Sequence, residues 1–108
     1  MKIIYSNYLP FNRFKAINLF GIVFARRQYF PLDKRAINHE YIHTRQMFEL
    51  FIVGFYIWYI LEWLYKLIIY KDRLMAYKKI SFEKEAYIND INLDYLRERK
   101  LFSFIKYL

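Results

Sequence analysis

The pattern of hydrophobic and polar positions divides the chain into two parts. Residues 1–31 contain both prolines and many β-branched and aromatic residues but no sustained helical periodicity, which predicts short strands. Residues 9–12, Leu-Pro-Phe-Asn, indicate a turn. The pair Phe20-Gly21 separates two apolar runs at 14–19 and 22–27. Because glycine adopts the backbone angles of a tight turn, we expect a β-hairpin here.

From residue 32 onward the spacing of apolar residues becomes helical. Asp33 can accept a hydrogen bond from an amide of a first turn, so a helix is predicted over 34–53. One stripe of this helix is apolar, at Ile37, Tyr41, Phe48 and Phe51, and another carries His39, His43, Gln46 and Leu50. Arg45 and Glu49 lie four residues apart, a spacing that predicts a solvated ion pair.

Residues 50–70 form an apolar and aromatic run that Glu62 and Lys66 interrupt. A membrane-spanning helix needs about 20 consecutive apolar residues. The favoured interpretation is therefore a helix that lies in the membrane interface, followed by a full span and then by a buried core helix. A straight helix from His43 to Tyr70 would end roughly 40 Å from the histidine. We therefore expect the chain to reverse near Gly54, so that later residues can return to it.

A further helix is predicted after Ser81, whose hydroxyl can cap it. Helical spacing places Glu83 on one side of this helix, together with Ala86, Tyr87 and Asp90. Glu85 points away from that side, with Asn89 and Asn92. The pattern as a whole predicts an α+β fold of one domain, 1–108, that is β-rich over 1–31 and mainly helical over 32–108.

Composition adds that the chain is both apolar and basic. Hydrophobic residues make up 57% of its 108 residues, aromatic residues make up 23%, and the formal net charge is +8. This combination indicates contact with a membrane surface. Nucleic acid is disfavoured, because the charges are spread along the chain without a base-reading motif. The chain has no cysteine, so redox chemistry does not fix its compartment. Because residues 1–7 show no secretory signal, the bulk of the chain is expected in the cytoplasm.

The only two histidines are the strongest candidates for chemistry. They lie in the pentapeptide His39-Glu40-Tyr41-Ile42-His43, which has the HExxH pattern of zinc-dependent hydrolases. Residues four apart share a helical face, so both imidazoles can reach one zinc ion while Glu40 addresses a metal-bound water. A third ligand is expected from the later helix, where the small Ala86 permits close approach. Glu83 lies on the same side of this helix as Ala86 and is therefore favoured as the third ligand, and Glu85 is the alternative.

Two separate segments together resemble the HExxH and ExxA motifs of gluzincin metallopeptidases: residues 39–46, HEYIHTRQ, and residues 83–86, EKEA. The resemblance implies zinc held by His39, His43 and Glu83, with Glu40 as general base. Tyr87 stands where relatives of the ExxAD type have an aspartate that steadies a ligand histidine. Asn38 and Asp90 are the candidates to replace that aspartate, and Tyr87 is a candidate catalytic donor to a developing oxyanion.

The resemblance also suggests where a substrate would lie. In many HExxH enzymes the strand before the motif helix pairs with an extended peptide. The expected substrate edge is therefore Ile22, Val23, Phe24, Ala25 and Arg26. The expected protein is a minimal zincin-like zinc peptidase at a membrane surface. The alternative is a non-catalytic membrane-associated module on the same scaffold that binds a metal or a peptide.

Overall fold

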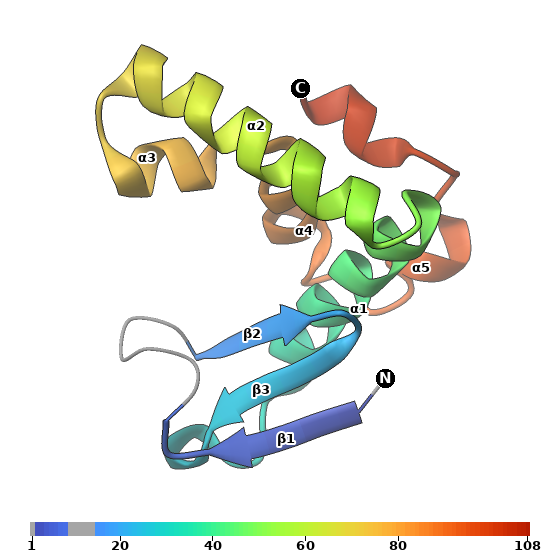
Figure 1. The fold of residues 1–108 in the computed structure, drawn as a ribbon. Helices are drawn as coiled ribbons and strands as arrows, with labels where there is room; N and C mark the ends of the chain where they lie inside the picture. The colour runs from blue at the N-terminus through green and yellow to red at the C-terminus, as the bar shows by residue number, and fades with distance from the viewer. Residues whose placement is uncertain (1, 9–14) are drawn as a thin grey trace.

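The computed structural model describes residues 2–8 and 15–108 and has a mixed α+β fold (Figure 1). Three strands form one sheet: β1 (Lys2–Ser6), β2 (Ala16–Leu19) and β3 (Ile22–Arg26). The α-helices of the described residues are α1 (Lys34–Glu49), α2 (Val53–Tyr70), α3 (Arg73–Lys78), α4 (Ser81–Asn89) and α5 (Tyr95–Glu98). Two short 3₁₀ helices are η1 (Arg27–Tyr29) and η2 (Ser103–Tyr107). The turn expected at 9–12 lies outside the described residues.

The predicted hairpin is confirmed, but the predicted substrate edge is wrong. Strands β2 and β3 are antiparallel, and Phe20 and Gly21 both have positive φ, as a two-residue hairpin turn requires. Strand β1 pairs with β3 in parallel, so the sheet order is β1-β3-β2. Residues Ile22, Val23, Phe24, Ala25 and Arg26 therefore form the central strand, hydrogen-bonded on both sides. In the part of the chain that the structure describes, β2 is the edge strand on the side of α1.

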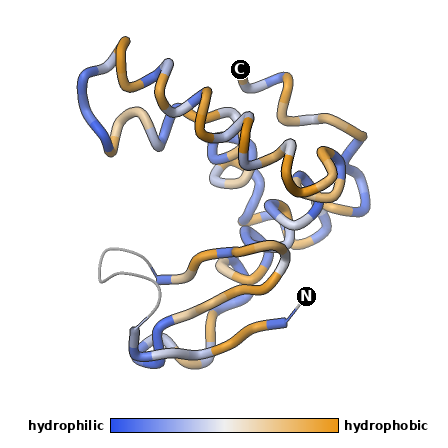
Figure 2. The backbone as a smooth tube through the Cα atoms, in the orientation of Figure 1, coloured by the Kyte–Doolittle hydropathy of each residue, from blue (hydrophilic) through white to orange (hydrophobic). Residues whose placement is uncertain are grey.

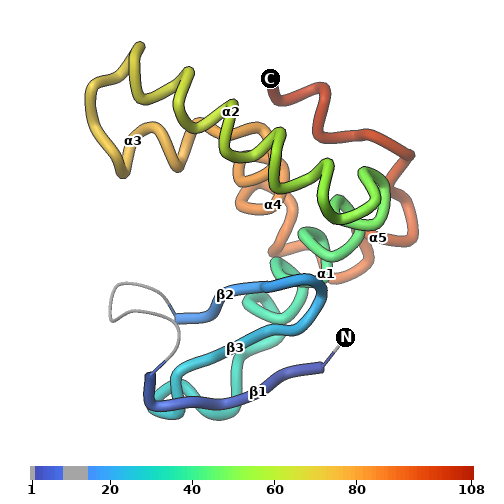
Figure 3. Tube along the Cα trace, in the orientation of Figure 1, coloured from blue at the N-terminus to red at the C-terminus, as the bar shows by residue number. Residues whose placement is uncertain are grey.

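Helix α1 begins as expected and ends earlier than expected. The carboxylate of Asp33 accepts a hydrogen bond from the Ala36 amide at 2.7 Å and caps the helix. The helix ends at Glu49, and Phe51 and Ile52 both have positive φ before α2 starts at Val53. The chain thus reverses near Gly54, but the glycine lies inside α2 and does not form the turn (Figure 3).

The larger of two hydrophobic core clusters lies between α1, α2, α4 and the C-terminal η2. It consists of the buried side chains Met47, Phe55, Ile80, Phe82 and Phe104. The ring of Phe82 lies 4.5 Å from that of Phe55 and 4.6 Å from that of Phe104, between centroids. This packing of aromatic rings fixes α4 against α2 and brings the start of α4 next to α1. The C-terminal segment therefore packs back onto the domain.

The start of α4 is held by a residue of α2. Glu62, the acid that interrupts the apolar run, is buried and accepts hydrogen bonds from the Ser81 amide at 2.6 Å and the Ser81 hydroxyl at 2.7 Å. The prediction that the Ser81 side chain caps α4 is wrong, because the helix begins at Ser81 and its hydroxyl donates to Glu62. This contact positions Glu83, two residues later, at the end of α4 that faces α1.

Candidate metal centre

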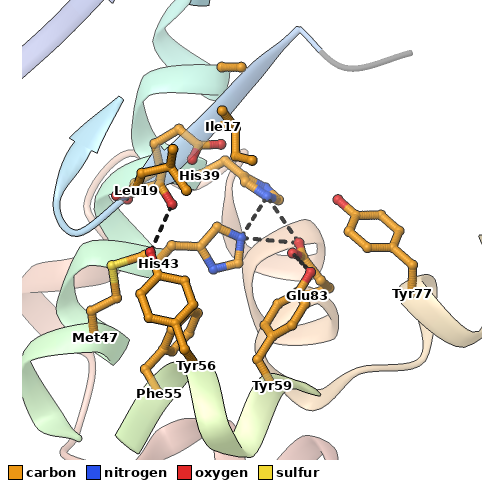
Figure 4. A pocket seen from close by; sticks show the side chains of 13 residues that line it. Ile17, Leu19, His39, His43, Met47, Phe55, Tyr56, Tyr59, Tyr77 and Glu83 are labelled. Carbon is orange, nitrogen blue, oxygen red and sulfur yellow. Dashed lines mark hydrogen bonds and ion pairs between the residues drawn. The ribbon is translucent and has the colours of Figure 1, made fainter. Parts of the chain in front are cut away.

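Helices α1 and α4 bring two imidazoles and one carboxylate together. His39 and His43 lie on successive turns of α1, and Glu83 lies in the first turn of α4 (Figure 4). The two Nε2 atoms are 3.1 Å apart. The Oε1 atom of Glu83 lies 3.1 Å from Nε2 of His43 and 3.4 Å from Nε2 of His39. All three side chains are buried. The residues favoured as ligands from the sequence are therefore adjacent in space.

Each imidazole is oriented by a partner at its other nitrogen. Nδ1 of His39 donates to the Asp90 carboxylate at 3.0 Å, and that carboxylate also accepts from Arg35 at 2.7 Å. Nδ1 of His43 lies 2.8 Å from Oε1 of Gln46. The amide nitrogen of Gln46 donates to the Phe82 carbonyl and to Glu85, so its oxygen must face His43. Both Nδ1 atoms therefore carry hydrogen, and both Nε2 atoms direct lone pairs toward the common centre.

Three acceptor atoms thus converge at one buried point, which requires a cation. Tetrahedral ligands at about 2.05 Å from zinc lie about 3.3 Å from one another. The observed separations of 3.1 to 3.4 Å agree with this value. Two imidazole nitrogens and one carboxylate oxygen are also a donor set that zinc takes, with a fourth position left for another ligand. The residues present therefore fit a zinc ion.

A proton is the other cation that this cluster can hold. Burial opposes charge on His43, but the Glu83 carboxylate outweighs burial and raises the pKa of His43 to about 9. Burial likewise opposes charge on Glu83, yet His43 and His39 keep its pKa well below the usual range. In the absence of metal, a protonated His43 therefore pairs with Glu83. Metal binding must displace that proton, as it does at other histidine sites.

Glu40 lies beside the three acceptors without joining their cluster. Its side chain is buried, and burial raises the pKa of its carboxyl group above the ordinary value, against the opposing effect of His43. A raised pKa brings a carboxylate closer to the range in which it takes up and releases protons near neutral pH. The backbone carbonyl of Glu40 accepts a hydrogen bond from the Asn18 side chain on β2 at 3.0 Å. Asn18 thereby fixes the edge strand over the motif.

The three acceptors and Glu40 line a cavity of about 280 Å³. The rest of its wall is mostly apolar and comes from β2, α1 and α2, with Ile17, Leu19, Met47, Phe55, Tyr56 and Tyr59 (Figure 4). A second, more polar hollow also borders His39 and Glu40 and is lined by Lys15, Asp33, Arg35 and Asp90. His39 and Glu40 therefore border two hollows of different polarity, and only the first is lined by all three acceptors.

Two of the predicted site residues lie elsewhere. Glu85, the alternative ligand, accepts hydrogen bonds from Arg99, Tyr95 and Gln46 and faces away from the cluster, so that alternative is wrong. Asn38 does not steady a histidine. Its amide donates to the carbonyls of Asp90 and Asn92 and links α1 to the segment after α4. Asp90 does contact His39, one turn after the position of the aspartate in the ExxAD motif.

Tyrosines surround the cluster, and sequence reasoning identified only one of them. The ring of Tyr87 packs against that of His39 at 4.5 Å between centroids, and its hydroxyl lies 2.9 Å from the Tyr77 hydroxyl. Tyr77 lines both cavities, and Tyr59 donates to Oε2 of Glu83 at 2.7 Å. Tyr59 thereby turns Oε1 of Glu83 toward the histidines. Nothing in the sequence distinguishes these two from the other tyrosines among the twelve in the chain.

Comparisons of the chain with protein-family models, with curated proteins and with solved structures found no match. The resemblance to gluzincins therefore rests on the two motif segments alone and stays a prediction.

Proposed function

We propose that this protein is a zinc-dependent peptide hydrolase. One observation carries the proposal: three buried acceptor atoms from His39, His43 and Glu83 converge at separations that suit zinc, with the Glu40 carboxylate in the same cavity wall. A site that only holds the fold together would have no use for a buried acid beside the ligands. Such an acid is what a hydrolytic reaction requires.

Zinc, when bound, supplies a Lewis acid that polarises a carbonyl group and lowers the pKa of water. Glu40 is the residue that takes a proton from the attacking water and returns it to the departing amine. Its burial in the wall of the same cavity as the three acceptors supports this role. Asp90 and Gln46 hold the two imidazoles in the orientation that directs Nε2 to the centre.

The edge strand β2 is the proposed support for the substrate, in place of β3. The carbonyl of Lys15 accepts from the Arg26 amide, so alternation along β2 directs the backbone groups of Ala16 and Asn18 away from β3. The Asn18 carbonyl accepts from the Tyr56 hydroxyl, and Ala16 lines the cavity. An extended peptide can pair there and place an apolar side chain among Leu19, Phe55 and Tyr56.

A specific observation also favours the non-catalytic alternative. His43 and Glu83 contact each other directly, and a protonated His43 would satisfy the cluster as a buried ion pair without any metal. In that case the pair would be one structural contact among several between α1 and α4, and Glu40 would have no catalytic role.

Substitution of Glu40 separates the two functions. Zinc-loaded wild type is incubated with a peptide library, and products are identified by mass spectrometry beside Glu40→Gln and the exposed control Glu98→Gln on α5. We expect wild type and Glu98→Gln to cleave equally, and Glu40→Gln to keep its zinc but lose about 10² to 10⁴-fold in rate. Equal turnover by Glu40→Gln, or no cleavage by zinc-loaded wild type, would contradict the proposal.

A further inference from the structure

Helix α2 exposes a continuous apolar stripe along its outer face. The stripe consists of Val53, Ile57, Ile60, Leu61, Leu64 and Ile68, which follow helical spacing and are between 45% and 75% exposed. It runs from the first turn of the helix to the last, a length of roughly 25 Å. Figure 2 shows the hydrophobic colouring of this helix and of the adjoining C-terminal segment. A soluble helix with one buried face normally carries polar residues at such positions.

The inner face of the same helix is already occupied. Phe55 packs into the core, Tyr59 donates to Glu83, and Glu62 is buried against Ser81. Both charged residues of α2, Glu62 and Lys66, lie off the stripe by helical spacing. The stripe also lies outside the cavity wall that contains His39 and His43. The stripe is therefore a surface separate from the candidate metal centre.

Length and composition alone would allow α2 to cross a membrane. The helix has 18 residues and a mean hydropathy of 1.2, and only 11% of it is buried. A crossing would, however, carry the elements packed on its inner face into the hydrocarbon, including Glu62 and the start of α4 with Glu83. Burying such groups in lipid is costly. A helix that lies in the plane of the interface immerses the stripe and leaves the inner face in its present contacts.

Positive charge accompanies the C-terminal half of α2. Burial lowers the pKa of Lys84, and the positive charges of Lys66 and Lys79 lower it further. The ammonium of Lys79 lies 5.9 Å from the centre of the Tyr70 ring at the end of α2. With a net charge of +8, the chain complements a surface of anionic headgroups rather than another copy of itself, because two copies would repel.

We propose that α2 docks in the plane of a lipid bilayer that contains anionic lipid, with the stripe in the acyl region and the lysine group at the headgroups. Aromatic rings at the margins of the helix, such as Trp63, Tyr65 and Tyr70, are of the types that favour the headgroup zone. The proposal does not depend on zinc or on catalysis, and it applies equally to the non-catalytic alternative.

Co-sedimentation of the full chain with vesicles tests the docking. Vesicles of equimolar phosphatidylcholine and phosphatidylglycerol are compared with vesicles of phosphatidylcholine alone. We expect binding to the anionic vesicles, and a loss of at least about tenfold in the double variant Ile60→Ser, Leu64→Ser, because two immersed side chains are removed. The matched control is Ile88→Ser, Ile91→Ser, which removes two exposed apolar side chains away from α2 and should bind as wild type does.

A separate variant tests how much the lysines contribute to vesicle binding. Lys66→Gln with Lys79→Gln should weaken binding to anionic vesicles by roughly fivefold per lysine and leave binding to neutral vesicles unchanged. Circular dichroism checks that each variant is folded. Failure of wild type to bind anionic vesicles would overturn the proposal, as would equal binding by the stripe variant. A dimer in sedimentation velocity that the stripe variant abolishes, without vesicle binding, would assign the face to a second copy instead.

Discussion

Two buried polar clusters join α1 to α4, and they differ in the source of their positive charge. In the first cluster, Glu49 of α1 and Glu85 of α4 both accept from the guanidinium of Arg99, with distances of 2.7 and 2.9 Å to Glu49. All three side chains are at most 3% exposed. The chain itself therefore supplies a cation whose charge is permanent at any ordinary pH.

The second cluster, His39, His43 and Glu83, has the same position between the helices but no such side chain at its centre. Its cation must be a proton or a metal ion, and both can be exchanged. Gln46 contacts both clusters, since it bonds to His43 through its oxygen and to Glu85 through its nitrogen. We infer from this difference that the first cluster, around Arg99, holds the two helices together. The second cluster, which the first holds in place, is the one suited to bind an exchangeable cation.

Substitution of Arg99 is expected to give the largest change in stability among the tests of this comparison. Arg99→Met leaves Glu49 and Glu85 buried without their cation, which should lower the free energy of unfolding by about 3 to 5 kcal/mol. Urea denaturation measures the change, with Arg97→Met on the exposed side of α5 as control. Addition of zinc should not recover the free energy of unfolding that Arg99→Met loses. A loss no larger than that of the control would show that the Arg99 cluster does not hold the helices together.

A fall in pH should weaken the Arg99 cluster gradually, and by less than the substitution of Arg99 does. Burial raises the pKa of Glu85, but hydrogen bonds from Arg99, Tyr95 and Gln46 outweigh it and hold that pKa below the ordinary 4.5. A carboxyl group with a lowered pKa in the folded state stabilises the protein above its unfolded pKa and loses this contribution as pH falls.

The free energy of unfolding of wild type should therefore decline as the pH is lowered below about 4.5. In Arg99→Met, burial still raises the pKa of Glu85, but the guanidinium that opposed it is gone. The decline in the free energy of unfolding with falling pH that is due to Glu85 should therefore shrink or change sign. Denaturation curves at several acidic pH values measure both proteins. Identical pH profiles would contradict the assignment of Glu85 to the Arg99 cluster.

The sequence predicted those features that depend on local geometry. The spacing of His39 and His43 places them on one face of any helix, and the capping aspartate and the Phe20-Gly21 turn act within a few residues. The helical face argument for Glu83 over Glu85 is local as well, and it agrees with the observed placement of the two side chains.

Features that depend on distant contacts were missed. Arg45, four residues away, was the expected partner of Glu49, yet Glu49 pairs with Arg99, which is 50 residues away in the sequence. Likewise, no spacing rule shows that β1 would pair with β3 and move the free edge to β2. The turn at Phe51 and Ile52 adopts positive φ without glycine, a conformation that the residue types at these positions do not favour.

The zinc content of the purified protein tests the central claim most directly. Wild type and Glu83→Gln are each incubated with zinc, dialysed and analysed for bound metal, with Glu98→Gln as an exposed control. The claim that the second cluster is built for an exchangeable metal predicts one zinc per chain in wild type and in the control, and a marked loss in Glu83→Gln. Wild type without zinc, or Glu83→Gln with as much zinc as wild type, would contradict it.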